Sequence, residues 1–236
     1  MARFPKRKMA EIKKTAKHRR PIEVIFFDLG NVILPFNHYQ IAEKLFPFVQ
    51  KKEFQDPREI FSYIFDLKNG AINAFDAGKL SPEEFFQSFK ESLQLSLSFE
   101  AFVPIWNEIF VEDREVSEII RSLKGRWRLG LLSNTDPLHF NYILSTFPIV
   151  SMLEKWILSY EVGFKKPDIH IFQKAIEWAS VKPERILFID DTKGHVEAAV
   201  SLGLQGIHFI SAAKLIEELF QKQVELNLDD FKKRGF

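Results

Sequence analysis

Short apolar runs recur along the chain in a pattern that predicts a sheet. The first, IEVIFF at residues 22–27, is too short for a helix, rich in β-branched and aromatic residues, and not strictly alternating. Runs of this kind suit strands that are buried on both faces. Similar runs follow later in the chain: WRLGLL at 127–132, KWILS at 155–159, RILFID at 185–190 and GIHFI at 206–210.

Helical patterns separate the later runs. DPLHFNYILSTF at 136–147 begins with an Asp-Pro start signal, PDIHIFQKAIEWA at 167–179 has apolar residues at helical spacing, and TKGHVEAAVSLG at 192–203 ends at a glycine. The apolar face expected for the second helix consists of Ile169, Phe172, Ile176 and Ala179. Alternating strands and helices predict an α/β fold with a Rossmann-like, doubly wound parallel sheet.

The long stretch between the first run and the second carries helical periodicity and no comparable strand pattern. Its clearest helix starts at SPEEFF, where Ser81 can cap, Pro82 fits the first turn and Glu84 completes a capping box. Aromatic residues recur at helical spacing and predict the core of a small bundle: Phe46, Phe54, Phe61, Phe65, Phe85, Phe86, Phe89, Phe102, Trp106 and Phe110. We therefore expect an inserted all-α helical cap over 36–114, a core over 21–35 and 115–236, and a leader over 1–20.

Charge is distributed unevenly along the 236 residues. The leader holds nine of the 33 Lys and Arg residues but only Glu11 of the 32 acidic residues, which leaves an acidic body. The leader predicts a solvated arm, with contact to nucleic acid or an anionic membrane as the alternative. An acidic body argues against nucleic acid as a substrate.

Targeting and redox signals are sparse. A secretory signal requires a longer apolar stretch than the leader has, and no window has the roughly 18 apolar residues of a membrane span. The absence of cysteine excludes disulfides, thiolate zinc sites and cysteine nucleophiles. We expect a cytoplasmic protein without a membrane span; its oligomeric state cannot be inferred.

Polar residues follow the predicted strands. Asp28 ends the first, Ser133-Asn134 the second and Asp190-Asp191 the fourth, while Lys165-Lys166-Pro167 lies in the loop after the third. Since ligands of parallel sheets bind beyond the carboxyl ends of the strands, these groups would meet at one edge. Singly, each is an ordinary turn, cap or surface residue.

Together, these groups suit a phosphate and a hard metal ion. Gathered carboxylates repel each other unless a cation lies among them, and an all-oxygen set favours magnesium over zinc. Phosphate oxygens could accept hydrogen bonds from Lys166, Ser133 and the backbone N–H groups of Leu29 and Gly30. Asp28 would then face the phosphorus.

These segments carry a family resemblance. DLGNVI from Asp28, LLSNTDPLH, SYEVGFKKPDIHIF, and ILFIDD followed by AAVSLG resemble the four ordered motifs of the haloacid dehalogenase superfamily, in its branch with a helical cap after the first strand. The DLGN form is similar to glucose-1-phosphatase-like members and to the phosphatase domain of soluble epoxide hydrolases. The resemblance implies a Mg²⁺-dependent phosphatase for small phosphorylated metabolites.

The resemblance also implies a role for each matching residue. Asp28 would be the nucleophile that forms an aspartyl-phosphate, and Lys166, rather than Lys165, would be the catalytic lysine. Ser133 would bind the transferring phosphoryl group, with Asn134 supporting it nearby. The implied magnesium ligands are Asp28, the carbonyl oxygen of Gly30, Asp191, and Asp190 directly or through water.

One position departs from the family pattern. Most phosphatases of this family place a second Asp, the general acid and base, where this chain has Gly30. General acid–base assistance contributes about 10² to 10⁴ in rate, so we expect reduced turnover of alkyl phosphates and a gain from Gly30→Asp. His195 also departs from the family, since relatives commonly carry Asn there, and an imidazole is bulkier.

Three interpretations of Gly30 remain open. The substrates can have good leaving groups, such as anomeric sugar phosphates or acyl phosphates. Alternatively, His38 or Tyr39 replaces the acid, although the sequence favours an exposed loop residue for His38. The third is a binding or regulatory protein with weak turnover. A metal-independent 2-haloacid dehalogenase is a separate alternative, against which the retained Asp190 and Asp191 argue.

Overall fold

The central sheet of the computed structural model has five parallel strands, in the order β3-β2-β1-β4-β5. The structure describes residues 22–66 and 70–226. The strands are β1 (Val24–Phe27), β2 (Arg128–Ser133), β3 (Lys155–Leu158), β4 (Ile186–Asp190) and β5 (Gln205–His208). Each lies within or next to an apolar run of the sequence. The predicted parallel sheet is confirmed, and β1 lies at its centre.

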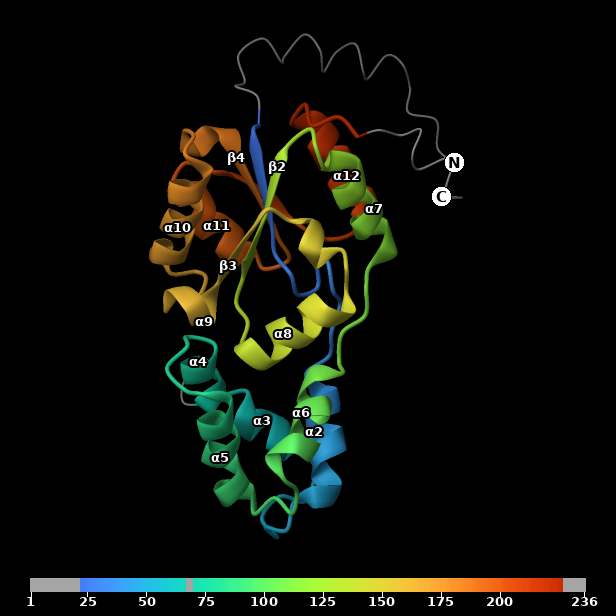
Figure 1. Ribbon diagram of the computed structural model, residues 1–236, viewed down its shortest axis with the longest axis vertical. Helices are drawn as coiled ribbons and strands as arrows, with labels where there is room; N and C mark the ends of the chain where they lie inside the picture. Colours follow the sequence, from blue (N-terminus) through green and yellow to red (C-terminus); the bar gives the residue numbers. More distant parts are fainter. Residues whose placement is uncertain (1–21, 67–69, 227–236) are drawn as a thin grey trace.

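Helices cover both faces of the sheet (Figure 1). They are α7 (Arg114–Leu123), α8 (Pro137–Thr146), α9 (Ser159–Val162), α10 (Ile169–Ala179), α11 (Lys193–Ser201) and α12 (Ala212–Gln221). Alternation along β1 sends Ile25 and Phe27 into a cluster with α7, α8 and α12, and sends Val24 and Phe26 toward α10 and α11. This layering confirms the predicted Rossmann-like α/β fold.

The start of α10 corrects one detail of the sequence analysis. Ile169 is the first helical residue and is exposed, whereas we expected it on the buried face. The residues that pack on the sheet are Ile171, Phe172, Ala175 and Ala179, with Ile176 partly buried. Ile169 begins the helix, two residues before the first of these packed side chains.

A second group of helices, here called the cap, lies beyond the carboxyl ends of the strands (Figure 1). It consists of α2 (Tyr39–Leu45), α3 (Pro57–Ile64), α4 (Ala71–Phe75), α5 (Pro82–Leu93) and α6 (Phe99–Asn107). The predicted capping box of α5 is present, with Ser81 and Glu84 each accepting a backbone hydrogen bond from the other. Its aromatic residues form a cluster separate from the two that flank the sheet.

Two adjacent segments connect the cap to the sheet. The N–H of Val111 donates to the carbonyl of Pro35 at 2.9 Å, and the N–H of Asp113 donates to the carbonyl of Ile33 at 3.0 Å. Phe36 and Phe110 form an antiparallel bridge beside them. The chain therefore enters and leaves the cap side by side.

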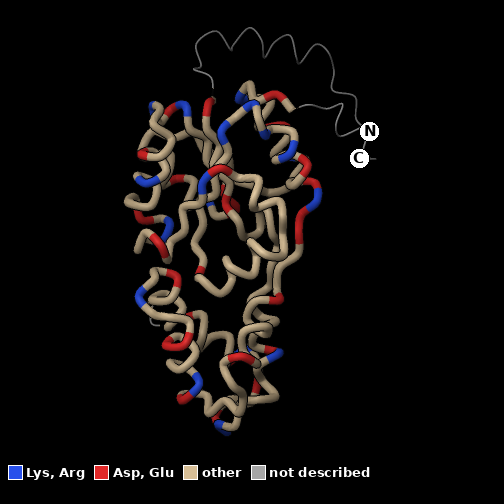
Figure 2. The backbone as a smooth tube through the Cα atoms, in the orientation of Figure 1, with Lys and Arg blue, Asp and Glu red and all other residues tan. Residues whose placement is uncertain are grey.

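Charged residues are interspersed on the helices of both parts of the molecule (Figure 2). Along the described ranges, no helix combines the length and apolar character needed to cross a membrane. Short 3₁₀ turns complete the described structure at Phe46–Phe48, Val150–Met152 and Pro183–Arg185. The predicted basic leader, residues 1–20, lies outside the described residues.

Candidate active site

The predicted polar residues meet at the carboxyl edge of the sheet. Asp28 directly follows β1, and its N–H donates to the carbonyl of Ile189 at 2.8 Å, which extends the pairing with β4. Ser133 ends β2 and Asp190 ends β4. The side chain of Lys166 reaches the same edge from the loop between α9 and α10. All four residues are buried, so their polar atoms depend on one another.

The ammonium of Lys166 joins two carboxylates. Its Nζ lies 2.7 Å from Oδ1 of Asp28 and 2.6 Å from Oδ2 of Asp190, and it donates to the carbonyl of Leu132 at 3.0 Å. The Lys166 side chain is 1% exposed. Three acceptors therefore satisfy its three donors, which is what a buried ammonium requires.

The environments of the two carboxyl groups shift their pKa values in opposite directions. Burial raises the pKa of Asp28 to about 6, although the charge of Lys166 opposes the shift. Burial alone would also raise the pKa of Asp190, but hydrogen bonding from His195 and the charge of Lys166 hold it below its usual value. Positive charge and hydrogen bonding therefore outweigh burial at Asp190, whereas burial outweighs them at Asp28.

Three carboxylates are close enough to hold one cation. Oxygen atoms of Asp28, Asp190 and Asp191 all lie within 4.8 Å of one another. Asp191 is half-buried and its carbonyl is 2.9 Å from Nε2 of His208, which fixes the backbone next to the acid pair. An all-carboxylate set beside a lysine that neutralises only part of the charge fits a hard divalent ion.

Asn134, predicted only to support the site nearby, makes a specific contact with the backbone of Lys166 that was not predicted. Its side-chain Nδ2 donates to the carbonyl of Lys166 at 2.9 Å, and its Oδ1 accepts from the N–H of Lys166 at 2.7 Å. The amide thus binds the backbone of the lysine whose side chain lies between the carboxylates. The hydroxyl of Ser133, also at this edge, donates to the carbonyl of Asn134 at 3.3 Å. The sequence signals for Asn134 were its position directly after a strand and its place in the LLSNTDPLH motif, and neither indicates this partner.

The turn after Asp28 is short and tightly packed. The N–H of Leu29 donates to Oδ1 of Asp28 at 2.7 Å. Asn31 has a φ of 55°, in the left-handed region that Asn tolerates better than most residues. A β-carbon added at Gly30 would lie 2.5 Å from Cε1 of Phe36. The ring of Phe36 therefore fills the space that a side chain at position 30 would enter.

His195 lies against the acid pair. Its Nδ1 is 3.1 Å from each carboxylate oxygen of Asp190, and its side chain is 18% exposed. A position that looked anomalous in sequence thus contacts a predicted metal ligand directly. The contact of the imidazole with both oxygens helps to fix the orientation of the Asp190 carboxylate.

Neither candidate for a replacement acid is an exposed loop residue. His38 is half-buried, which corrects that expectation, and it stacks on Phe65 with ring centroids 4.5 Å apart. Burial lowers the pKa of His38 to about 3, and the nearby His139 adds to this effect. His38 is therefore neutral at pH 7 and lacks an imidazolium proton to donate. Tyr39 is half-buried and packs edge-on against Phe61.

A buried polar bridge joins the core to the cap near the site. Asp136, the N-cap of α8, accepts from Nε1 of Trp106 in α6 at 3.2 Å and lies 2.7 Å from Nδ1 of His139. Nε2 of His139 is 2.9 Å from the carbonyl of Trp106. Both ring nitrogens thus face acceptors. Burial alone would lower the pKa of His139, but the Asp136 carboxylate raises it above its usual value.

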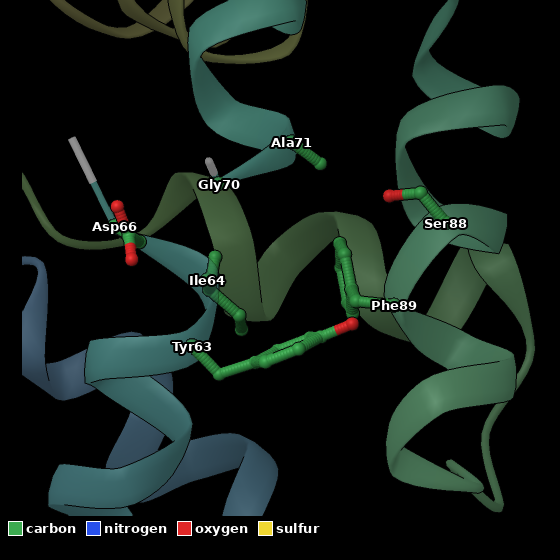
Figure 3. Close-up of a pocket in the computed structure, with 7 residues that line it drawn as sticks. All are labelled: Tyr63, Ile64, Asp66, Gly70, Ala71, Ser88 and Phe89. Atoms are coloured by element: carbon green, nitrogen blue, oxygen red, sulfur yellow. The ribbon is translucent and has the colours of Figure 1, made fainter. Parts of the chain in front are cut away.

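A pocket of about 300 Å³ lies inside the cap (Figure 3). It is lined by residues of α3, α4 and α5 and of the connection between α3 and α4: Tyr63, Ile64, Asp66, Gly70, Ala71, Ser88 and Phe89. Figure 3 shows the ring of Tyr63 reaching across from α3 toward Phe89 of α5. None of the strand-edge residues lines this pocket, so it is separate from the candidate active site.

The fold and the edge together define a class of protein. A parallel α/β sheet with an acid after its central strand, a buried lysine and an acid pair suits hydrolysis at a charged centre. Residues 22–203 match the haloacid dehalogenase-like hydrolase family. The chain belongs to that family, as the ordered motifs predicted.

Two proteins to which this chain is similar are named for phosphatase or nucleotidase activity. D-ribitol-5-phosphate phosphatase from Bacteroides thetaiotaomicron is 26% identical over 205 residues, covering 84% of this chain and 97% of that protein. Pyrimidine 5'-nucleotidase YjjG from Escherichia coli is 24% identical over 190 residues, covering 76% of this chain and 82% of that protein. This chain is thus a hydrolase of the haloacid dehalogenase-like family that is similar to a named phosphatase and a named nucleotidase.

A solved structure supports the same assignment. A haloacid dehalogenase family enzyme from B. thetaiotaomicron, in complex with magnesium and inorganic phosphate, superimposes with a TM-score of 0.69 at 25% identity. The match covers 79% of this chain and 93% of the other. The relative thus binds the metal and the anion for which the strand edge of this chain has suitable groups.

Proposed function

We propose that this protein is a magnesium-dependent phosphomonoester hydrolase for small phosphorylated metabolites, working through an aspartyl-phosphate. The observation that carries the proposal is the placement of the Lys166 ammonium between Asp28 and Asp190, beside Asp191. This arrangement presents a carboxylate nucleophile and positive charge at one edge of the sheet. A carboxylate attacks a dianionic phosphate only where positive charge neutralises the phosphate oxygens.

In the first step, a carboxylate oxygen of Asp28 attacks phosphorus and the bond to the leaving oxygen breaks. Lys166 and the hydroxyl of Ser133 bind oxygens of the transferring group. Asn134 holds the backbone of Lys166, through the two hydrogen bonds of its side-chain amide. In the second step, water attacks the phosphorus of the acyl phosphate, which releases inorganic phosphate and restores the Asp28 carboxylate.

The residues that would hold magnesium are Asp28, Asp190 and Asp191, with the carbonyl of Gly30. The bound ion supplies further positive charge that stabilises the phosphoryl oxygens. The clustering of the three carboxylates supports this ligand set. It also argues against a metal-independent dehalogenase, because three ionised carboxylates with one lysine would leave unbalanced negative charge at the edge.

The leaving group defines the favoured substrates. Gly30 offers no proton, Phe36 occupies the space beside it, and His38 is neutral at pH 7. Substrates whose leaving groups depart without a proton, such as acyl phosphates and anomeric sugar phosphates, therefore suit the site better than alkyl phosphates. D-ribitol 5-phosphate, the compound named for the bacterial relative, is an alkyl phosphate and provides a direct contrast.

The test is a substrate panel assayed with magnesium and with a chelator. Acetyl phosphate, para-nitrophenyl phosphate, a sugar 1-phosphate and D-ribitol 5-phosphate cover a range of leaving groups. We expect magnesium-dependent turnover that is highest for the acyl phosphate and is abolished by Asp28→Asn. Background rates for every substrate, in folded protein that binds magnesium, would contradict the proposal.

The packing of Phe36 on Gly30 favours one second candidate, a binding or regulatory protein with only weak turnover. In that case the edge would bind a phosphorylated ligand and release it unchanged. Calorimetric binding without hydrolysis would support this candidate, and hydrolysis at an ordinary enzymatic rate would exclude it.

A further inference from the structure

The two adjacent lysines at 165 and 166 contact different parts of the molecule. Whereas Lys166 lies among the carboxylates of the sheet edge, Nζ of Lys165 is 2.8 Å from Oδ2 of Asp76 and donates to Oδ1 of Asn73 at 3.2 Å. Asn73 lies in α4 and Asp76 is its C-cap, so both partners belong to the cap. The side chains of Lys165 and Asp76 are 25% and 16% exposed, which places the ion pair largely out of water.

A second contact brings the same two segments together. Gly78 has a φ of +68°, and a β-carbon there would overlap the carbonyl of Tyr160. The cap backbone after α4 therefore passes directly over α9. Tyr160 and Lys165 lie on either side of Gly163, so both contacts are on the core segment that leads to Lys166.

This contact lies away from the connection between cap and core. Figure 1 shows α4 facing α9 on one side of the molecule, while the paired segments that enter and leave the cap run along the other side. A rotation of the cap about those segments would separate α4 from α9 more than it would separate groups near the connection. The ion pair is thus where cap opening would have its largest effect.

We propose that the contact of Lys165 with Asp76 and Asn73 is a latch, through which the closed cap positions Lys166 at the active site. Lys165 and Asp76 are then positioning residues, which act through the backbone that Lys166 shares with Lys165. Loss of the latch lets the loop move and misplaces the ammonium of Lys166. The role of this latch in turnover rests on the proposed phosphatase function, whereas its role in cap closure does not.

The chemical test is a double-mutant cycle with Asp76→Ala, Lys165→Met and the double variant. We expect kcat for acetyl phosphate to fall by about 10- to 100-fold in each single variant, because misplacement of a catalytic group by about 1 Å costs up to that much. The double variant should be no worse than either single one. A small substrate makes this readout report on Lys166 rather than on contacts between the cap and the leaving group.

Lys174→Met is the matched control. Lys174 also pairs with a carboxylate, Glu177, at 2.9 Å, but both side chains are about half-exposed on α10. This variant should keep the parent kcat. An equal fall in the control would indicate a general effect of removing charge.

Cap closure can be measured without turnover. The chain has no cysteine, so spin labels can be placed at Glu91→Cys in α5 and Gln173→Cys in α10, both exposed. We expect one narrow distance distribution in the parent and the Lys174→Met background, and a broader one in Asp76→Ala and Lys165→Met. The affinity for inorganic phosphate, measured by calorimetry with magnesium, should fall in the same two variants because Lys166 is misplaced.

The outcomes separate the two proposals. An inactive parent with the expected changes in distance and phosphate affinity would contradict the phosphatase function and leave the latch in place. Unchanged distances would overturn the latch. Broadened distances with unchanged kcat and unchanged phosphate affinity would overturn the positioning of Lys166.

Discussion

The sheet edge and the cap hold their side chains in place by different forces. At the edge, Asp28 and Asp190 are buried carboxylates that share the ammonium of Lys166. In the cap, the buried groups are rings such as Phe85, whose centroid is 4.2 Å from that of Phe75. A buried charge requires every partner, whereas a packed ring requires only filled volume. Substitutions at the edge should therefore change both chemistry and stability, and substitutions in the cap core mainly stability.

The largest effect is expected from Lys166→Met. Removal of the ammonium leaves two buried carboxylates facing each other, and breaking a buried pair in this way costs about 3–5 kcal/mol. Turnover should be lost as well. Urea denaturation without magnesium measures the stability change. Lys174→Met is the control, since its surface pair should contribute no more than about 0.5 kcal/mol. An equal loss of unfolding free energy in the two variants would contradict a larger contribution from the buried pair.

Phe85→Ala tests the core of the cap, as Lys166→Met tests the sheet edge. Truncation of a fully buried Phe costs about 3–5 kcal/mol through lost contacts and the cavity left behind. The affinity of the edge for inorganic phosphate should not change, because Phe85 contacts Phe75, Phe89 and Trp106 rather than the carboxylates. Thermal unfolding and phosphate calorimetry measure the two quantities. A loss of phosphate affinity together with thermal stability would show that the cap core and the sheet edge are less independent than their packing indicates.

Gly30→Asp tests the missing acid, and the structure sharpens the experiment. The single variant should gain little, because its β-carbon would meet the ring of Phe36. With Phe36→Ala in the background, turnover of D-ribitol 5-phosphate should rise by about 10²-fold, the lower end of general acid–base assistance. Phe36→Ala alone is the reference. Equal rates in the reference and the double variant, both folded and magnesium-binding, would exclude proton transfer as the missing element.

The smallest effect is expected from His139→Gln, and it depends on pH. Asp136 raises the pKa of His139 above the ordinary histidine value of 6.5, so this stabilisation is complete below pH 6.5 and is lost as pH rises through the folded-state pKa. His139 in turn helps to hold the pKa of Asp136 below 3.8, so that contribution is lost as pH falls through the folded-state pKa of the acid.

The pair of Asp136 and His139 therefore stabilises the protein most between pH 3.8 and pH 6.5, the unfolded-state pKa values of the two groups. The difference in unfolding free energy between the parent and His139→Gln should be about 1–3 kcal/mol at pH 5–6 and smaller at pH 9. Denaturation series at the two pH values measure it. A difference that grows toward pH 9 would contradict a cationic His139.

The strand ends could be predicted from sequence because their chemistry is local. Buried strands leave apolar runs, and Asp28 or Asp190 follows such a run directly. The convergence of these residues then follows from the parallel sheet alone.

The contacts between distant elements could not be predicted in this way. Asn134 binds the backbone of Lys166, and Phe36 packs on Gly30, through tertiary geometry that leaves no periodic signal in either segment. The Asp-Pro start signal at Asp136 does begin α8, but the bond from Asp136 to Trp106 depends on how α6 of the cap meets α8. Sequence patterns indicate which face of an element is buried, and not which side chain it meets.

The paired segments at 33–36 and 110–113 have a consequence for how this protein could be altered. Because the two ends of the insertion are hydrogen-bonded neighbours, a short turn could bridge them and leave β1 and β2 in register. The helical insertion is in this sense a replaceable module: a different one could be grafted at the same junction to change substrate choice, provided that it also offers Lys165 the partners that Asp76 and Asn73 supply.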